Sequence, residues 1–231
     1  MLIGAHVSTA GGLAKALERG GDMGCEAIQI FPQSPRMWRP TAYTESDFVA
    51  YRSAQHGSPV KASLIHAIYL INCASRETEV KRKSAAALAH ALRVGEGILA
   101  TGVVLHAGAR KGEPHAPSMR RAATMIRSAL DASDSCPLLL ENTAGTQGPL
   151  GRDLDELAEL IDLAGADDRL GICIDCCHLF ASGRNIVEPE GLAVERTRRV
   201  DVLEHQVDVV DADGFHSNLR RSLALIPWYG G

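Results

Sequence analysis

Histidines and carboxylates follow most of the short apolar runs in this sequence of 231 residues. The set comprises His6, His66, His106, Glu141, Asp175, His178 and His205. Neutral imidazole and carboxylate groups are the ligands that zinc and other first-row divalent ions take in proteins. A glutamate has two oxygens and can bridge two ions, as a two-metal hydrolytic site requires. These residue types therefore predict a metal centre, provided that the fold brings them together.

The apolar runs have the composition of strands in a parallel sheet. They are Leu2–Ala5, Ala27–Phe31, Ala62–Ile65, Val103–Leu105, Leu138–Leu140, Leu170–Ile174 and Val200–Leu203. Several are apolar without alternation, which is typical of strands buried on both faces. Stretches with helical periodicity separate them, such as residues 154–161 with apolar side chains at i, i+3, i+4 and i+7. Such alternation leaves two architectures, the doubly wound sheet and the closed α/β barrel.

The positions of the candidate ligands favour the barrel. In a closed α/β barrel the carboxyl ends of all strands meet on one face, where catalytic residues lie. In an open sheet the same residues would be spread along an edge and could not all converge. Asp175 and His178 are three residues apart at one strand end, so both can face the same cavity.

Composition and charge limit the functions that this chain can have. Hydrophobic residues make up 45% and charged residues 23%, with a formal net charge of −4. Because nucleic-acid binders usually show a basic balance, any DNA contact must come from local basic residues or bound cations. We see no signal peptide, no apolar stretch long enough for a membrane span and no disulfide framework among the six cysteines. We therefore expect a cytoplasmic protein.

Four motifs resemble those of the endonuclease IV family, in the family's order. They are GAHVSTAGG at 4–12, HAIYLIN at 66–72, ENTAG at 141–145 and CIDCCH at 173–178, the last with Cys176 where threonine is usual. The resemblance covers residues 1–185, and residues 186–231 diverge. It implies a single xylose-isomerase-like barrel of the TIM (β/α)8 type over residues 1–231.

The resemblance also implies a site that binds up to three zinc ions, with manganese as an alternative. His66, His106 and Glu141 would hold the first ion. Glu141 would bridge to a second ion, which Asp175 also binds, and His178 would bind a third. The implied reaction is hydrolysis of the phosphodiester 5′ to an abasic site in duplex DNA, in base excision repair. Glu141 is then the residue expected to carry catalysis, through the ions that it bridges.

Three residues match positions at which the family contacts DNA. Ser34 and Arg36 lie in the loop after the second apolar run, which in the family enters the minor groove. Tyr69 matches a position near the extruded abasic sugar, and a missing base lowers the cost of taking the nucleotide out of the stack. The alternative for the loop is a surface turn around a packed Trp38.

Beyond residue 185 the resemblance weakens. His205 falls about where a further ligand belongs, but its neighbours differ, and His216 is a candidate for the third ion. The family continues through an eighth strand with a metal-binding glutamate, whereas this sequence ends at Gly231. We expect the last strand to be missing or altered, which would leave strand edges unpaired unless the tail or a partner covers them.

Two other functions stay open. One is an inactive remnant that binds metal or DNA. The other is a sugar isomerase on a related barrel, which should supply a lysine near the metals, and none stands at a strand end.

The C-x-x-C of Cys173 and Cys176 could suggest thiolate zinc or a redox pair, but Cys173 lies within an apolar run and no second pair exists. We expect a monomer, and we expect His115 to be a solvated loop residue.

Overall fold

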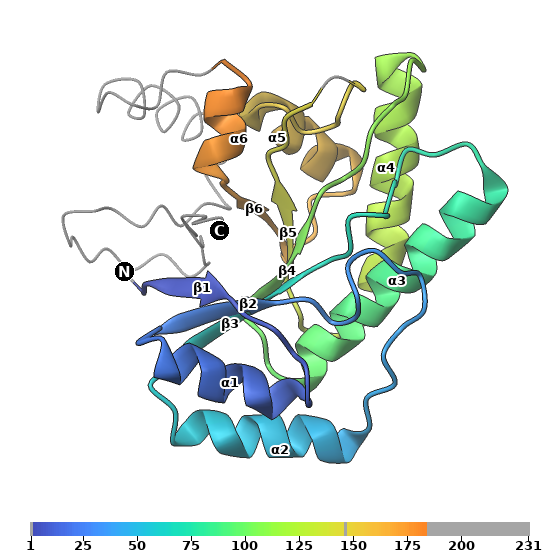
Figure 1. Cartoon of the computed structure of the whole chain (residues 1–231). Helices are drawn as coiled ribbons and strands as arrows, with labels where there is room; N and C mark the ends of the chain where they lie inside the picture. The colour runs from blue at the N-terminus through green and yellow to red at the C-terminus, as the bar shows by residue number, and fades with distance from the viewer. Residues whose placement is uncertain (1, 146, 184–231) are drawn as a thin grey trace.

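The computed structural model describes residues 2–145 and 147–183, in which six strands alternate with six helices (Figure 1). The strands are β1 (Gly4–His6), β2 (Ala27–Ile30), β3 (Ala62–His66), β4 (Gly102–Leu105), β5 (Leu138–Glu141) and β6 (Leu170–Cys173). The helices are α1 (Leu13–Asp22), α2 (Glu45–His56), α3 (Thr78–Gly97), α4 (His115–Leu130), α5 (Leu154–Leu163) and α6 (Cys176–Ala181). Each strand pairs in parallel with the next, so the sheet order equals the chain order.

Local side-chain interactions start several of the helices. α2 begins with a capping box, in which Oγ1 of Thr44 accepts from the Asp47 amide and the Asp47 side chain accepts from the Thr44 amide. α5 is capped by Asp153, whose carboxylate accepts from the Glu156 amide. Such caps satisfy amide groups that the first helical turn leaves without partners. α1 to α5 then run along the outside of the sheet (Figure 1).

The two faces of the sheet have separate apolar layers. Side chains on one face pack with the helices into the large core, among them Ile65, Val103, Leu138 and Ile172. A second, smaller cluster consists of Leu64, Val104, Leu139 and Cys173. Side chains of a strand alternate between faces, so the residue two positions further along returns to the same face. The second cluster therefore forms an apolar layer directly beneath His66, His106, Glu141 and Asp175.

The predicted strands are present within two residues at each end for the six that fall on described residues. The predicted α/β barrel architecture is thus observed as a parallel sheet with outer helices, although the barrel is not closed over residues 2–145 and 147–183. The seventh predicted strand, His205 and His216 lie outside the described residues. Among the described helices, none is long and apolar enough to cross a membrane.

Candidate metal centre

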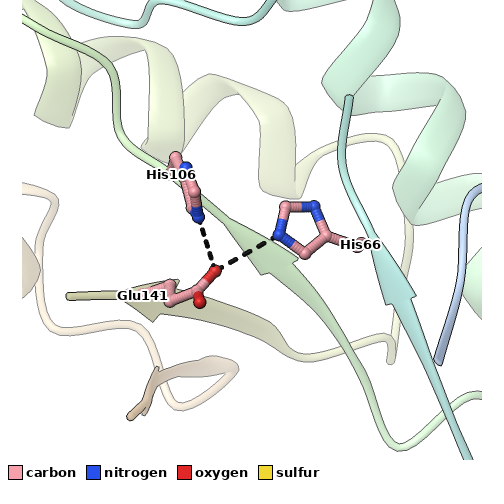
Figure 2. Close-up of side chains that lie close together, drawn as sticks. All are labelled: His66, His106 and Glu141. Atoms are coloured by element: carbon pink, nitrogen blue, oxygen red, sulfur yellow. Dashed lines mark ion pairs between the residues drawn. The ribbon is translucent and has the colours of Figure 1, made fainter. Parts of the chain in front are cut away.

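Three predicted ligands meet at the ends of β3, β4 and β5 (Figure 2). Nε2 of His106 lies 2.8 Å from Oε2 of Glu141, and Nε2 of His66 lies 3.3 Å from the same oxygen. One donor atom from each residue falls within 4.8 Å of the other two. His66 and Glu141 are buried, with 6% and 5% of their surface exposed. Two imidazoles and a carboxylate in this spacing form a suitable ligand set for a divalent ion.

Two polar atoms at the centre of this group are buried and face each other. Oε2 of Glu141 and Nε2 of His106 are both buried and lie 2.8 Å apart as an ion pair. Buried polar atoms need partners, and a cation between these atoms would satisfy the imidazole and the carboxylate together. Burial alone would raise the pKa of Glu141, but the imidazoles of His106 and His66 outweigh it and hold this pKa well below its usual range. Glu141 is therefore ionised, as a metal ligand must be.

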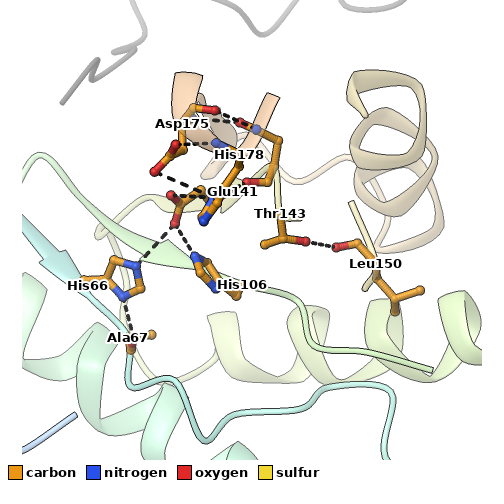
Figure 3. Close-up of polar contacts among 9 residues, drawn as sticks. His66, Ala67, His106, Glu141, Thr143, Leu150, Asp175 and His178 are labelled. Atoms are coloured by element: carbon orange, nitrogen blue, oxygen red, sulfur yellow. Dashed lines mark hydrogen bonds and ion pairs between the residues drawn. The ribbon is translucent and has the colours of Figure 1, made fainter. Parts of the chain in front are cut away.

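Glu141 also belongs to a second group, with Asp175 and His178 (Figure 3). Nδ1 of His178 lies 3.6 Å from Oε1 of Glu141 and 3.7 Å from Oδ2 of Asp175. Asp175 is the N-cap of α6, and its Oδ1 accepts from the His178 amide at 2.8 Å. One Asp175 oxygen is thus used for the cap, which leaves Oδ2 facing the group. The two groups share Glu141, so the site can hold a pair of ions bridged by this carboxylate.

The backbone sets the tautomer of one candidate ligand. Nδ1 of His66 lies 2.6 Å from the carbonyl oxygen of Ala67, which can only accept, so Nδ1 carries the proton. In the neutral ring Nε2 then carries the lone pair, and it points toward Glu141 (Figure 3). Metal-binding histidines usually donate their other ring N–H to a carbonyl or carboxylate in this way.

Aromatic rings form one wall of the site. The Tyr69 ring is 5.1 Å from the His66 ring and 5.9 Å from the His106 ring, measured between centroids, and 55% of this residue is exposed. Burial, followed by the charges of Glu141 and Asp175, raises the pKa of its phenol. The ring of Phe31 packs between those of His6 and Tyr69, at 4.4 and 5.3 Å. Tyr69 therefore offers an accessible apolar face beside the carboxylates, as its predicted DNA contact would need.

The loop after β2 presents the other two predicted contact residues to solvent. Ser34 and Arg36 are both exposed. Buried Gln33 holds the loop, because its Nε2 donates to the Met37 carbonyl at 2.8 Å, and the Met37 amide donates to the Ser34 carbonyl. Trp38 is partly buried against the core, so the turn with a packed tryptophan and the exposed polar side chains occur together.

Some residues differ from their predicted setting or were not singled out. His115 does not lie in a loop but begins α4, and its partly exposed ring places Nε2 2.9 Å from Oε1 of Glu156. Cys173 is buried in the inner layer, which agrees with its assignment to a strand. Asn142 of the ENTAG motif has no predicted role of its own, yet it is fully buried against Asp175. An asparagine next to a strand-end glutamate in an apolar context was the only signal available for it.

The fold and this site agree with what the chain is similar to. Residues 17–218 match the family model described as the xylose isomerase-like TIM barrel. The chain is 37% identical over 194 residues to the "Probable endonuclease 4" of Methanoculleus marisnigri, which spans 83% of this chain and 69% of that protein. The crystal structure of endonuclease IV from Thermus thermophilus superposes with a TM-score of 0.76 at 33% identity, and covers 89% of this chain and 74% of that one.

These likenesses define the class as a xylose isomerase-like TIM barrel with a candidate metal centre at its strand ends. Within that class, the chain belongs to the endonuclease IV family. A D-tagatose 3-epimerase-like protein also superposes, with a TM-score of 0.56 at 19% identity over 82% of this chain and 71% of that one. That likeness shows the shared fold alone.

Proposed function

We propose that this chain is a metal-dependent AP endonuclease that hydrolyses the phosphodiester 5′ to abasic sites in duplex DNA, in base excision repair. The observation that carries the proposal is the pair of ligand groups that share Glu141. Relatives that are 33–37% identical carry the name "Probable endonuclease 4", which supports hydrolysis of a nucleic-acid phosphodiester.

The proposed ligands of the first ion are His66, His106 and Glu141, and those of the second are Glu141 and Asp175, with His178 holding a third ion nearby. We assign zinc, because two imidazoles with carboxylates suit it, with manganese as the second choice. When bound, such ions activate water and offset charge on the attacked phosphate and the leaving oxygen. Within the protein, Glu141 supplies an ionised carboxylate, and a buried apolar layer lies below it.

The proposed DNA contacts lie on the same side as the strand ends. Arg36 is an exposed cation in a loop that Gln33 anchors, and it would contact a phosphate. Ser34, in the same loop, would donate a hydrogen bond to the DNA backbone. Tyr69 would place its exposed ring against the extruded sugar. Bound cations and this local positive charge would together offset the net charge of −4.

We further propose that residues 1–231 form one domain that acts as a monomer in the cytoplasm. Sedimentation of the purified chain tests the monomer. The activity is tested with a duplex that carries one abasic site, incubated with the purified chain with added zinc, with added manganese and after chelation. We expect nicking 5′ to the site that requires metal and is lost in Glu141→Gln. A folded chain that binds metal without nicking would favour an inactive family member.

A further inference from the structure

The side-chain amide of Asn142 links the end of β5 to the end of β6. Its Nδ2 donates to the Asp175 carbonyl at 2.9 Å, and its Oδ1 accepts from the Asp175 amide at 2.8 Å. Both backbone groups of Asp175 are thus bound by one side chain that lies 33 positions earlier in the chain. Such a paired contact fixes the position and the orientation of the Asp175 backbone.

The backbone of Asn142 holds a second member of the same group. Its carbonyl oxygen lies 2.9 Å from Nδ1 of His178. A carbonyl can only accept, so Nδ1 of His178 carries the proton and Nε2 keeps the lone pair that a metal ion needs. Asn142 is also adjacent to Glu141 in the chain. All three members of the second group are therefore positioned by one residue or joined to it.

Asn142 has no route to substrate. It is 0% exposed, and each of its hydrogen-bonding groups described above is directed at Asp175 or His178. A buried amide with both ends hydrogen-bonded adds rigidity that three side chains meeting at the strand ends do not have on their own. Its role must therefore be exerted through the residues that it holds.

We propose that Asn142 is a positioning residue, which prearranges Asp175 and His178 for metal binding and selects the Nδ1–H tautomer of His178. The inference rests on the metal centre of the proposed function, but not on nuclease activity. It predicts that the second group loses affinity without Asn142, while the group of His66, His106 and Glu141 keeps it.

The first test measures the His178 tautomer in the metal-free protein. Long-range ¹H–¹⁵N spectra of the histidine rings report which nitrogen carries the proton, and we expect Nδ1–H for His178 in the natural chain. In Asn142→Ala the two bonds to Asp175 are lost, so the α6 end moves away from the carbonyl. We expect His178 to populate the Nε2–H tautomer in this variant.

The second test measures Zn²⁺ binding with a competing chelator. We expect Asn142→Ala to weaken zinc binding at Asp175 and His178 by about 10- to 100-fold, the usual cost of losing a residue that orients metal ligands. The ion held by His66, His106 and Glu141 should bind as in the natural chain. Asn142→Asp keeps the acceptor for the Asp175 amide and loses the donor, so it provides an isosteric variant should Asn142→Ala fail to fold.

Asn72 provides the matched control. It is also a buried asparagine, and its amide spans two strand-end loops by donating to the Ala109 carbonyl and accepting from the Ala109 amide. Asn72→Ala should lower thermal stability without changing the His178 tautomer. Equal effects of both variants on that tautomer, or no effect of either Asn142 variant, would overturn the proposal. A natural chain that binds no zinc would instead contradict the proposed function, and the tautomer comparison would still decide the role of Asn142.

Discussion

Oε2 of Glu141 lies 2.8 Å from Nε2 of His106, and both atoms are buried. Glu141 is at the same time within reach of Asp175 and His178, so one carboxylate joins both ligand groups. Glu141→Gln keeps the shape of this side chain and removes its charge. We expect zinc affinity to fall by more than about 100-fold, above the range for an outer-shell partner. Isothermal titration checks this result, and native-like circular dichroism would show that the loss is not unfolding.

The exposed Arg36 allows a test of the proposed DNA surface. If this guanidinium contacts one phosphate, Arg36→Ala should reduce the slope of log affinity against log salt concentration by about 1. The measurement is binding to an abasic duplex at several salt concentrations. Arg127 on the outer helix α4 is the matched control, because it is an exposed arginine away from the strand ends. Equal changes in slope for Arg36→Ala and Arg127→Ala would contradict the assignment.

Gly108 is two residues past His106, and its substitution by alanine tests how tightly the strand-end loops are packed. Its φ is +101°, and an added Cβ would lie 2.3 Å from Oδ1 of Asn72. Gly112 in the same loop has φ +86° and nothing within 4 Å of its added Cβ. We expect Gly112→Ala to cost about 1 kcal/mol from backbone strain alone, and Gly108→Ala roughly 3 kcal/mol from strain and overpacking. Urea unfolding of both variants measures the difference, and equal costs would contradict the packing argument.

The cysteines next to and away from the site should differ in reactivity. Cys177 is exposed, whereas Cys73 and Cys136 are buried and burial raises the pKa of each thiol to about 12. Because the thiolate is the reactive form, we expect the buried pair to react only on unfolding. A disulfide reagent at pH 8 should show a fast phase that Cys177→Ser removes. A fast phase that persists in Cys177→Ser would assign it to another thiol.

The sequence alone determined where the strands lie and which residues stand at their ends. Val103–Leu105 and Leu138–Leu140 are apolar throughout because both faces of these strands are covered, and that property is local and readable. The polar residues His106 and Glu141 that follow were therefore expected at the same side of the sheet. The roles of Ser34, Arg36 and Tyr69 in DNA binding stay predictions.

Only the tertiary structure decided that His66 and His106 lie against the same oxygen of Glu141, and which residues position the candidate ligands. The convergence of His66 and His106 on Glu141 depends on the register of β3, β4 and β5, which local patterns do not encode. The bonds of Asn142 reach Asp175 across 33 positions, and the pairing of His115 with Glu156 joins α4 to α5. Hydrogen-bond partners distant in the chain are selected by how strands and helices pack, so composition and spacing could not identify them.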